Sequence, residues 1–182
     1  MLARLTDGLE AVVVRIGRIA AWAGLALVLV TVFDVAARGV TQSAWAPLRA
    51  LAEAQQQWFG STKLQELEWH LHTVLFALCL GYAYLRGAHV RIDLVRERMG
   101  ACTRLWVEVA GIVLFLLPFC AVVLWFGAGF VARSFADGEM SASAAGLGQR
   151  WIIKGVLVAG FALLGLAGVA TLARTVRRLR GG

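Results

Sequence analysis

The sequence predicts an all-α integral membrane protein with four transmembrane helices, both termini in the cytoplasm and a short amphipathic surface helix. Of its 182 residues, 60% are hydrophobic and only 16% are charged. Soluble chains average about 45–50% apolar and about 25% charged residues. Four apolar runs reach the ~20 residues that a bilayer span requires. Together these observations indicate a single membrane domain, residues 1–182.

The four predicted spans cover residues 16–37, 67–85, 105–131 and 151–173. The first could instead be a signal peptide, because basic residues precede it. Its apolar run, however, exceeds the ~7–15 residues of a signal sequence. Asp34 and Arg38 follow it without a small-residue cleavage site. We therefore expect a retained first span.

Positive charge in the loops sets the expected orientation. Twelve of the 18 Lys and Arg residues lie in the N-terminal segment up to Arg18, between spans two and three, and after span four. The richer side is expected to be cytoplasmic. Because the basic residues lie between apolar runs and not on one polar face, they predict contact with phospholipid headgroups and no nucleic acid.

The first outer loop, residues 38–66, carries apolar and aromatic residues interleaved with Arg49, Glu53 and three glutamines. These are Trp45, Leu48, Leu51, Trp58 and Phe59. Pro47 stands near the start, where a helix tolerates proline. The pattern favours an amphipathic helix on the membrane surface or against a partner. The alternative is an irregular loop with aromatic anchors.

Polar residues in or beside the spans are the first functional candidates, because their burial requires a partner. Asp34 and Arg38 are four residues apart and predict an interfacial ion pair, with a proton or cation site as the alternative. Glu108 is expected to pair with Arg104. Pro118 should kink or loosen span three.

Span two opens with a polar strip that contains Glu66, Glu68, Trp69, His70 and His72. Positions two apart on a helix lie about 200° apart, so the Glu66/His70 and Glu68/His72 pairs face nearly opposite ways. This geometry excludes one four-ligand metal site on the helix. We interpret the strip as a polar helix start, with Trp69 at the aromatic belt and one face toward another protein.

A second strip follows span two and contains Arg86, Gly87, His89, Arg91 and Asp93. Gly87 permits a sharp exit from the helix. Val90, Ile92 and Leu94 alternate with the charged residues, a pattern suited to an interface. The alternative is a generic basic loop. His89 lies on the opposite side of the membrane from His70 and His72, which argues against an internal bis-histidine haem.

Small residues at helical spacing predict close helix packing. They form one stripe on span one and one on span four: Gly17, Ala21 and Gly24, and Gly155, Ala159 and Ala162. Cys79, Cys102 and Cys120 have no metal-ligand or disulfide spacing. The sequence has no Walker loop, dinucleotide fingerprint or nucleophile arrangement. We therefore expect neither enzymatic activity nor a cofactor in this chain. Its few buried polar groups indicate that it is one subunit of a larger membrane complex.

The two strips and the predicted topology resemble the small permease subunit of tripartite ATP-independent periplasmic (TRAP) transporters, the DctQ-like family, over residues 20–175. The strips that carry the resemblance are Gln65-Glu66-Leu67-Glu68-Trp69-His70 and Gly87-Ala88-His89-Val90-Arg91-Ile92-Asp93-Leu94. The Glu-x-Glu-Trp-His form is similar to a branch labelled mannitol/chloroaromatic, whose members serve organic acids.

This resemblance implies a multi-pass subunit of the bacterial inner membrane with two protein partners. A large permease would hold the substrate and sodium sites and use the sodium gradient for symport. A periplasmic binding protein would deliver a carboxylate. The small subunit would scaffold the permease and help the binding protein dock. Two alternatives from other classes are a membrane anchor of a respiratory complex, with or without haem, and a small self-assembling exporter.

Overall fold

The computed structural model describes residues 2–41, 45–58, 60–88 and 97–181, and every long element among them is helical. Its helices are α1 (Leu2–Thr41), α2 (Ala46–Trp58), α3 (Gly60–Leu85), α5 (Ala101–Gly111), the π-helical turn η1 (Ile112–Leu116), α6 (Leu117–Ala136) and α7 (Arg150–Gly181). Because α5, η1 and α6 run on without a break, they form one rod.

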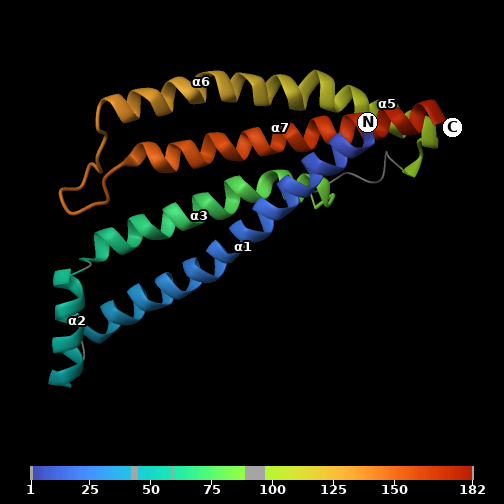
Figure 1. Ribbon diagram of the computed structural model, residues 1–182. Helices are drawn as coiled ribbons and strands as arrows, with labels where there is room; N and C mark the ends of the chain where they lie inside the picture. The colour runs from blue at the N-terminus through green and yellow to red at the C-terminus, as the bar shows by residue number, and fades with distance from the viewer. Residues whose placement is uncertain (1, 42–44, 59, 89–96, 182) are drawn as a thin grey trace.

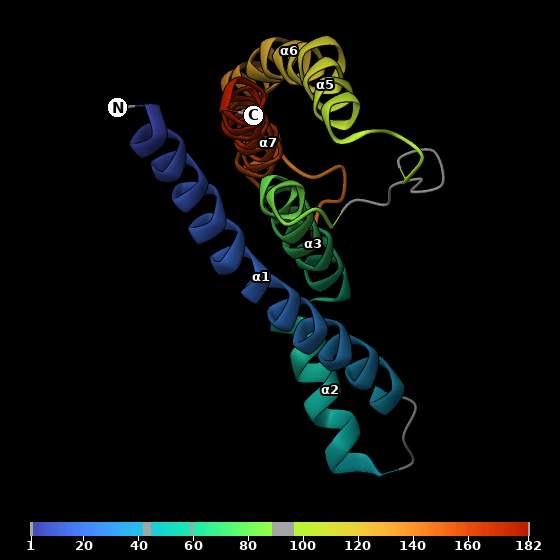
Figure 2. The same cartoon turned by 90° about the vertical axis from the view of Figure 1, so that its right-hand side faces the viewer.

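Four long rods lie side by side, with α3 between α1 and α7, and α6 on the far side of α7 (Figure 1). Seen from the perpendicular direction, α5 and α6 remain away from α1 (Figure 2). The two chain ends lie at one end of the bundle, which we call the terminal end. The short helix α2 and the segment 137–149 lie at the opposite end, which we call the loop end.

Three of the described helices are long and apolar enough to cross a membrane: Thr6–Thr41, Ala101–Ala136 and Arg150–Gly181. These match the predicted spans one, three and four. The helix at the position of span two, α3, has 26 residues, a length of roughly 39 Å. Its first half carries Glu66, Glu68, His70 and His72, which lower its mean hydropathy.

The rod that contains Pro118 widens just before the proline. Residues Ile112–Leu116 form a π-helical turn, and the N–H of Leu117 donates to the carbonyl of Ile112, five residues back. Proline has no N–H to donate and its ring crowds the preceding turn, so the helix relaxes there. The predicted loosening of span three is confirmed.

Glycines bring α3 into direct contact with its neighbours. A Cβ placed on Gly81 would lie 2.8 Å from the carbonyl oxygen of Leu163, and one on Gly160 would lie 2.6 Å from the carbonyl carbon of Ala77. On α1, a Cβ at Gly17 would lie 2.9 Å from Cγ of Tyr82. Only glycine permits this backbone approach.

The predicted packing stripes agree with this contact in part. Gly17 packs against α3, and Gly24 lies near Leu75, but Ala21 is exposed. On α7 the face that packs against α3 runs through Gly160, and the predicted residues Gly155, Ala159 and Ala162 lie mostly off that face. A Cβ on Gly155 would meet nothing within 4 Å, Ala159 is exposed and Ala162 is only half-buried.

The predicted surface helix is confirmed as a helix, α2, with Pro47 in its first turn. Ala52 is buried against the rest of the chain, whereas Leu51 is exposed. Arg49 and Glu53 pair across one turn at 3.7 Å. Phe59 lies outside the described residues.

Candidate functional site

The carboxylate of Glu66 joins three parts of the loop end. It accepts hydrogen bonds from the hydroxyl of Ser141 and from the backbone N–H of Leu147, the latter at 2.5 Å. The guanidinium of Arg150 lies 3.9 Å away. These contacts tie the start of α3 to the segment 137–149 and to the first residue of α7. We call Glu66 and these three partners, with Trp69 and His70, the Glu66 cluster.

The aromatic members of the Glu66 cluster lie one turn further along α3. The ring of His70 lies 4.0 Å from that of Trp69, and its Nδ1 lies 2.5 Å from the backbone carbonyl of Glu66. The guanidinium of Arg150 lies over Trp69, 5.7 Å from the ring centre. A cation–π contact of this kind helps to stabilise the packing of α7 against α3.

These contacts lower the pKa of the Glu66 carboxyl below its ordinary value of 4.5. The hydrogen bond from Ser141 contributes most, followed by that from Leu147. Burial opposes them, and the charges of Arg150 and His70 add smaller contributions. All the favourable contacts require the carboxylate form, because only that form accepts every bond without donating one.

We expect the segment 137–149 to loosen in acid. A carboxyl whose pKa falls on folding stabilises the fold above its unfolded pKa and ceases to do so as pH falls through the folded pKa. For Glu66 that loss lies below pH 4.5. A nitroxide on Ala144→Cys, with exposed Cys102 replaced by serine, should keep constant mobility from pH 8 to pH 5 and become more mobile below pH 4.5. Unchanged mobility at pH 3 would contradict this.

A second carboxylate holds the other end of the same segment. Glu139 pairs with Lys154 of α7 and accepts a hydrogen bond of 2.6 Å from the hydroxyl of Ser134. The Lys154 ammonium lies 3.8 Å from the centre of the Phe130 ring. These contacts, led by Lys154, also lower the pKa of Glu139. We call Glu139, Lys154 and Ser134 the Glu139 cluster. The acid experiment therefore needs Glu66→Gln/Glu139→Gln as a control, whose label mobility should not change with pH.

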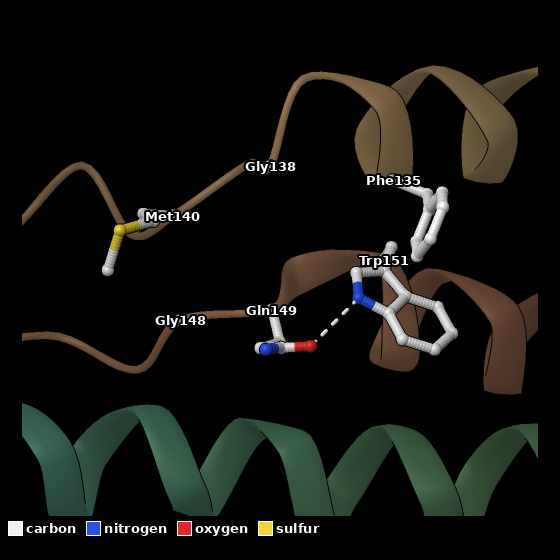
Figure 3. A pocket seen from close by; sticks show the side chains of 6 residues that line it. All are labelled: Phe135, Gly138, Met140, Gly148, Gln149 and Trp151. Atoms are coloured by element: carbon white, nitrogen blue, oxygen red, sulfur yellow. Dashed lines mark hydrogen bonds between the residues drawn. The ribbon is translucent and has the colours of Figure 1, made fainter.

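Beside these clusters lies a hollow of about 280 Å³ at the loop end (Figure 3). Phe135 and Trp151 meet edge to face at 5.3 Å, and the Trp151 indole N–H donates to the side-chain oxygen of Gln149 at 3.0 Å. Gln149 has a φ of 61°, a left-handed conformation that turns the chain into α7. Met140 is exposed at the rim. Large apolar side chains on a surface indicate contact with lipid or protein.

The predicted ion pair on α1 is confirmed. Arg38 pairs with Asp34, whose side chain is only 1% exposed. The Ser61 hydroxyl donates to the other carboxylate oxygen at 3.3 Å. In the amide orientation that satisfies both groups, Gln65 accepts two bonds of 3.0 Å from Arg38. The pair therefore joins the loop ends of α1 and α3.

The structure separates the polar strip of span two as its helical spacing predicts. Glu66 and Trp69 contact Arg150 of α7, and His70 lies against Trp69, whereas the ring of His72 lies against Phe76. Glu68 is half-buried and one of its oxygens has no hydrogen-bond partner. Among the described residues, no three His, Cys, Asp or Glu side chains form a group that could hold a metal ion.

The second strip is described only at its start. Arg86 lies over the Tyr82 ring at 5.5 Å, and Gly87 has a φ of 64° at the exit from α3, as predicted. His89, Arg91 and Asp93 lie outside the described residues. The prediction that Glu108 pairs with Arg104 is wrong. Arg104 instead donates to the backbone carbonyls of Met99 and Glu97, because the helix begins at Ala101 and these carbonyls precede it.

Six residues of the Glu66 and Glu139 clusters were not predicted from the sequence as site residues: Ser141, Leu147, Arg150, Glu139, Lys154 and Ser134. Their partners lie on other elements, and for Glu66 they are 75 and 81 residues away. The one local signal is Arg150 and Lys154 at the start of an apolar run, where unpaired charges are unfavourable.

Comparison with known proteins agrees with this architecture. A family model described as "Tripartite ATP-independent periplasmic transporters, DctQ component" matches residues 27–178. The matched range begins within α1 and contains both clusters and the hollow. No curated protein matches the chain.

Proposed function

Because this chain belongs to the family of DctQ components of tripartite ATP-independent periplasmic transporters, it is a small membrane subunit of such a transporter, and we propose that it is the fixed scaffold of a sodium-driven system for organic acids. The family match shows that the chain is a small membrane subunit of such a transporter. The Glu66 and Glu139 clusters support the scaffold role, since their ion pairs and hydrogen bonds hold helices and a loop together, as a static frame requires.

We propose that the chain crosses the membrane four times, and that α3 is a span in addition to the three helices that are long and apolar enough. The neighbours α1 and α7 lie on either side of α3 (Figure 1). The carboxylate of Glu66 lies just before the predicted span, and its three partners in the folded chain compensate its charge where α3 meets the bilayer. The excess of basic residues in the N-terminal segment, in the loop between spans two and three and in the C-terminal tail favours a cytoplasmic location for both termini. The loop end is then periplasmic.

In this arrangement a large permease subunit holds the substrate and sodium sites and moves against the scaffold. A periplasmic binding protein delivers the substrate to the loop end. The hollow of Figure 3 and the exposed face of α2 are the surfaces that this end offers for docking. Exposed aromatic residues on α6, such as Trp125 and Phe126, suit contact with lipid or with the permease.

Co-purification and reconstitution test the proposal. The chain, co-expressed with a large permease subunit of the same transporter, should be retained on an affinity-tagged permease. Liposomes that contain the chain alone should take up carboxylates no faster than empty liposomes, with or without a sodium gradient. Liposomes with all three components should show sodium-dependent uptake. Sodium-driven uptake by the chain alone would contradict the scaffold proposal.

A further inference from the structure

The terminal half of α1 carries two arginines with no acidic partner. Arg15 and Arg18 are three residues apart, so their guanidinium groups lie on one face of the helix. Both are exposed, and neither forms an ion pair in the described structure. The nearest carboxylate along the helix, Glu10, pairs instead with Arg174 of α7 at 3.0 Å.

The basic residues on the facing side of α7 are occupied differently. Arg174 binds Glu10, and Arg177 donates to the hydroxyl of Thr6 at 2.9 Å. The α1–α7 contact thus engages both side chains, and Glu10 compensates the charge of Arg174. Arg15 and Arg18 lie outside it, and Figure 2 shows this half of α1 reaching away from α5 and α6. Their positive charge is left for a ligand from outside the chain.

The two arginines lie at the edge of a shallow apolar hollow of about 610 Å³. Its lining residues all belong to α1: Ala11, Val12, Val14, Arg15, Arg18 and Ile19. Trp22 lies one turn beyond Arg18 and is 71% exposed. Along α1, Ile19 and then Trp22 follow the two arginines, so positive charge gives way to exposed apolar side chains, as headgroups give way to acyl chains in a lipid leaflet.

We propose that Arg15 and Arg18 form a binding site for one anionic phospholipid, with its phosphate between the guanidinium groups and an acyl chain along Ile19 and Trp22. A phosphate accepts hydrogen bonds from two arginines in the geometry that guanidinium favours. A zwitterionic lipid would bring its own cation close to the arginines, which would weaken its binding. The inference depends on the proposed function only in assigning this lipid to the cytoplasmic leaflet.

Native mass spectrometry of the full chain in a neutral detergent tests the site, with phosphatidylglycerol and phosphatidylcholine added in equal amounts. The chain should retain one phosphatidylglycerol in preference to phosphatidylcholine. Replacing both arginines (Arg15→Gln/Arg18→Gln) should weaken phosphatidylglycerol binding roughly 30-fold, because one basic side chain at an anionic surface contributes about fivefold. Arg15→Lys/Arg18→Lys should keep most of the binding.

The matched control is Arg178→Gln/Arg180→Gln, which removes two exposed charges of α7 outside the hollow and should leave phosphatidylglycerol binding within twofold. Equal retention of both lipids by the native chain would overturn the proposal, as would equal weakening by the control. Displacement of the lipid by millimolar inorganic phosphate would show a site for the free anion and would also overturn it. Since the assay needs no permease, its result is independent of the transport proposal.

Discussion

The Gly160→Ala variant is expected to lose about 1–3 kcal/mol of its free energy of unfolding, the usual cost of an overpacked core. The added methyl group would lie 2.6 Å from the carbonyl carbon of Ala77 and 2.7 Å from its Cβ. Neither neighbour is the end of a flexible side chain, so α3 and α7 must move apart. That movement would also separate Gly81 from the carbonyl of Leu163 and weaken the Glu66 cluster.

Gly155→Ala is the matched control on the same helix. A Cβ there meets nothing within 4 Å, and alanine favours a helix over glycine by up to about 1 kcal/mol. This variant should be as stable as the native chain or slightly more so. Unfolding by titration with sodium dodecyl sulfate in mixed micelles, followed by circular dichroism, measures both. Equal stability of the two variants would show that the α3–α7 contact is not as close as described.

The Glu66→Gln variant is expected to release the segment 137–149 and to lower uptake by the complete transporter. Both Ser141 and Leu147 donate to Glu66, one to each oxygen. A glutamine offers one oxygen, and its NH₂ group would face a donor. Hydrogen bonds to charged groups are stronger than neutral ones, so amide exchange across the segment should rise roughly tenfold or more.

Glu68→Gln is the control for this experiment. It makes the same chemical change two residues away, on a side chain with one oxygen that has no hydrogen-bond partner. Amide exchange in residues 137–149 should stay as in the native chain. Hydrogen-exchange mass spectrometry measures both variants, and uptake by the reconstituted three-component transporter gives the functional result. Faster exchange in Glu68→Gln than in Glu66→Gln would refute the role given to Glu66.

Features set by neighbouring residues were predictable from the sequence. The apolar runs indicated the long helices, the spacing of Asp34 and Arg38 indicated their pair, and Pro118 indicated the loosened turn. The length of the helices beyond the spans was less predictable: α1 runs from Leu2 to Thr41, whereas the predicted first span covers only residues 16–37. Charged residues end the apolar run but do not end the helix.

Features set by distant residues were not predictable. The small residues of α7 offer more than one stripe, and the sequence cannot distinguish Gly155 from Gly160. In a bilayer the helix face toward lipid is as apolar as the face toward protein, so hydrophobic periodicity does not mark the packed side. The partners of Glu66 were not predictable either, because nothing in the sequence of a loop shows which carboxylate its serine or its backbone N–H will contact.

The long separation between Glu66 and Leu147 also affects biogenesis. Ribosomes add about 5–20 residues per second, so the 81 residues between donor and acceptor take roughly 4–16 seconds to synthesise. During this interval α3 emerges with a carboxylate whose partners do not yet exist. The least apolar rod of the bundle must therefore wait near the translocon, or beside α1, until the segment 137–149 and Arg150 are made. Chains that stop before this segment would leave the Glu66 carboxylate without any of its three partners.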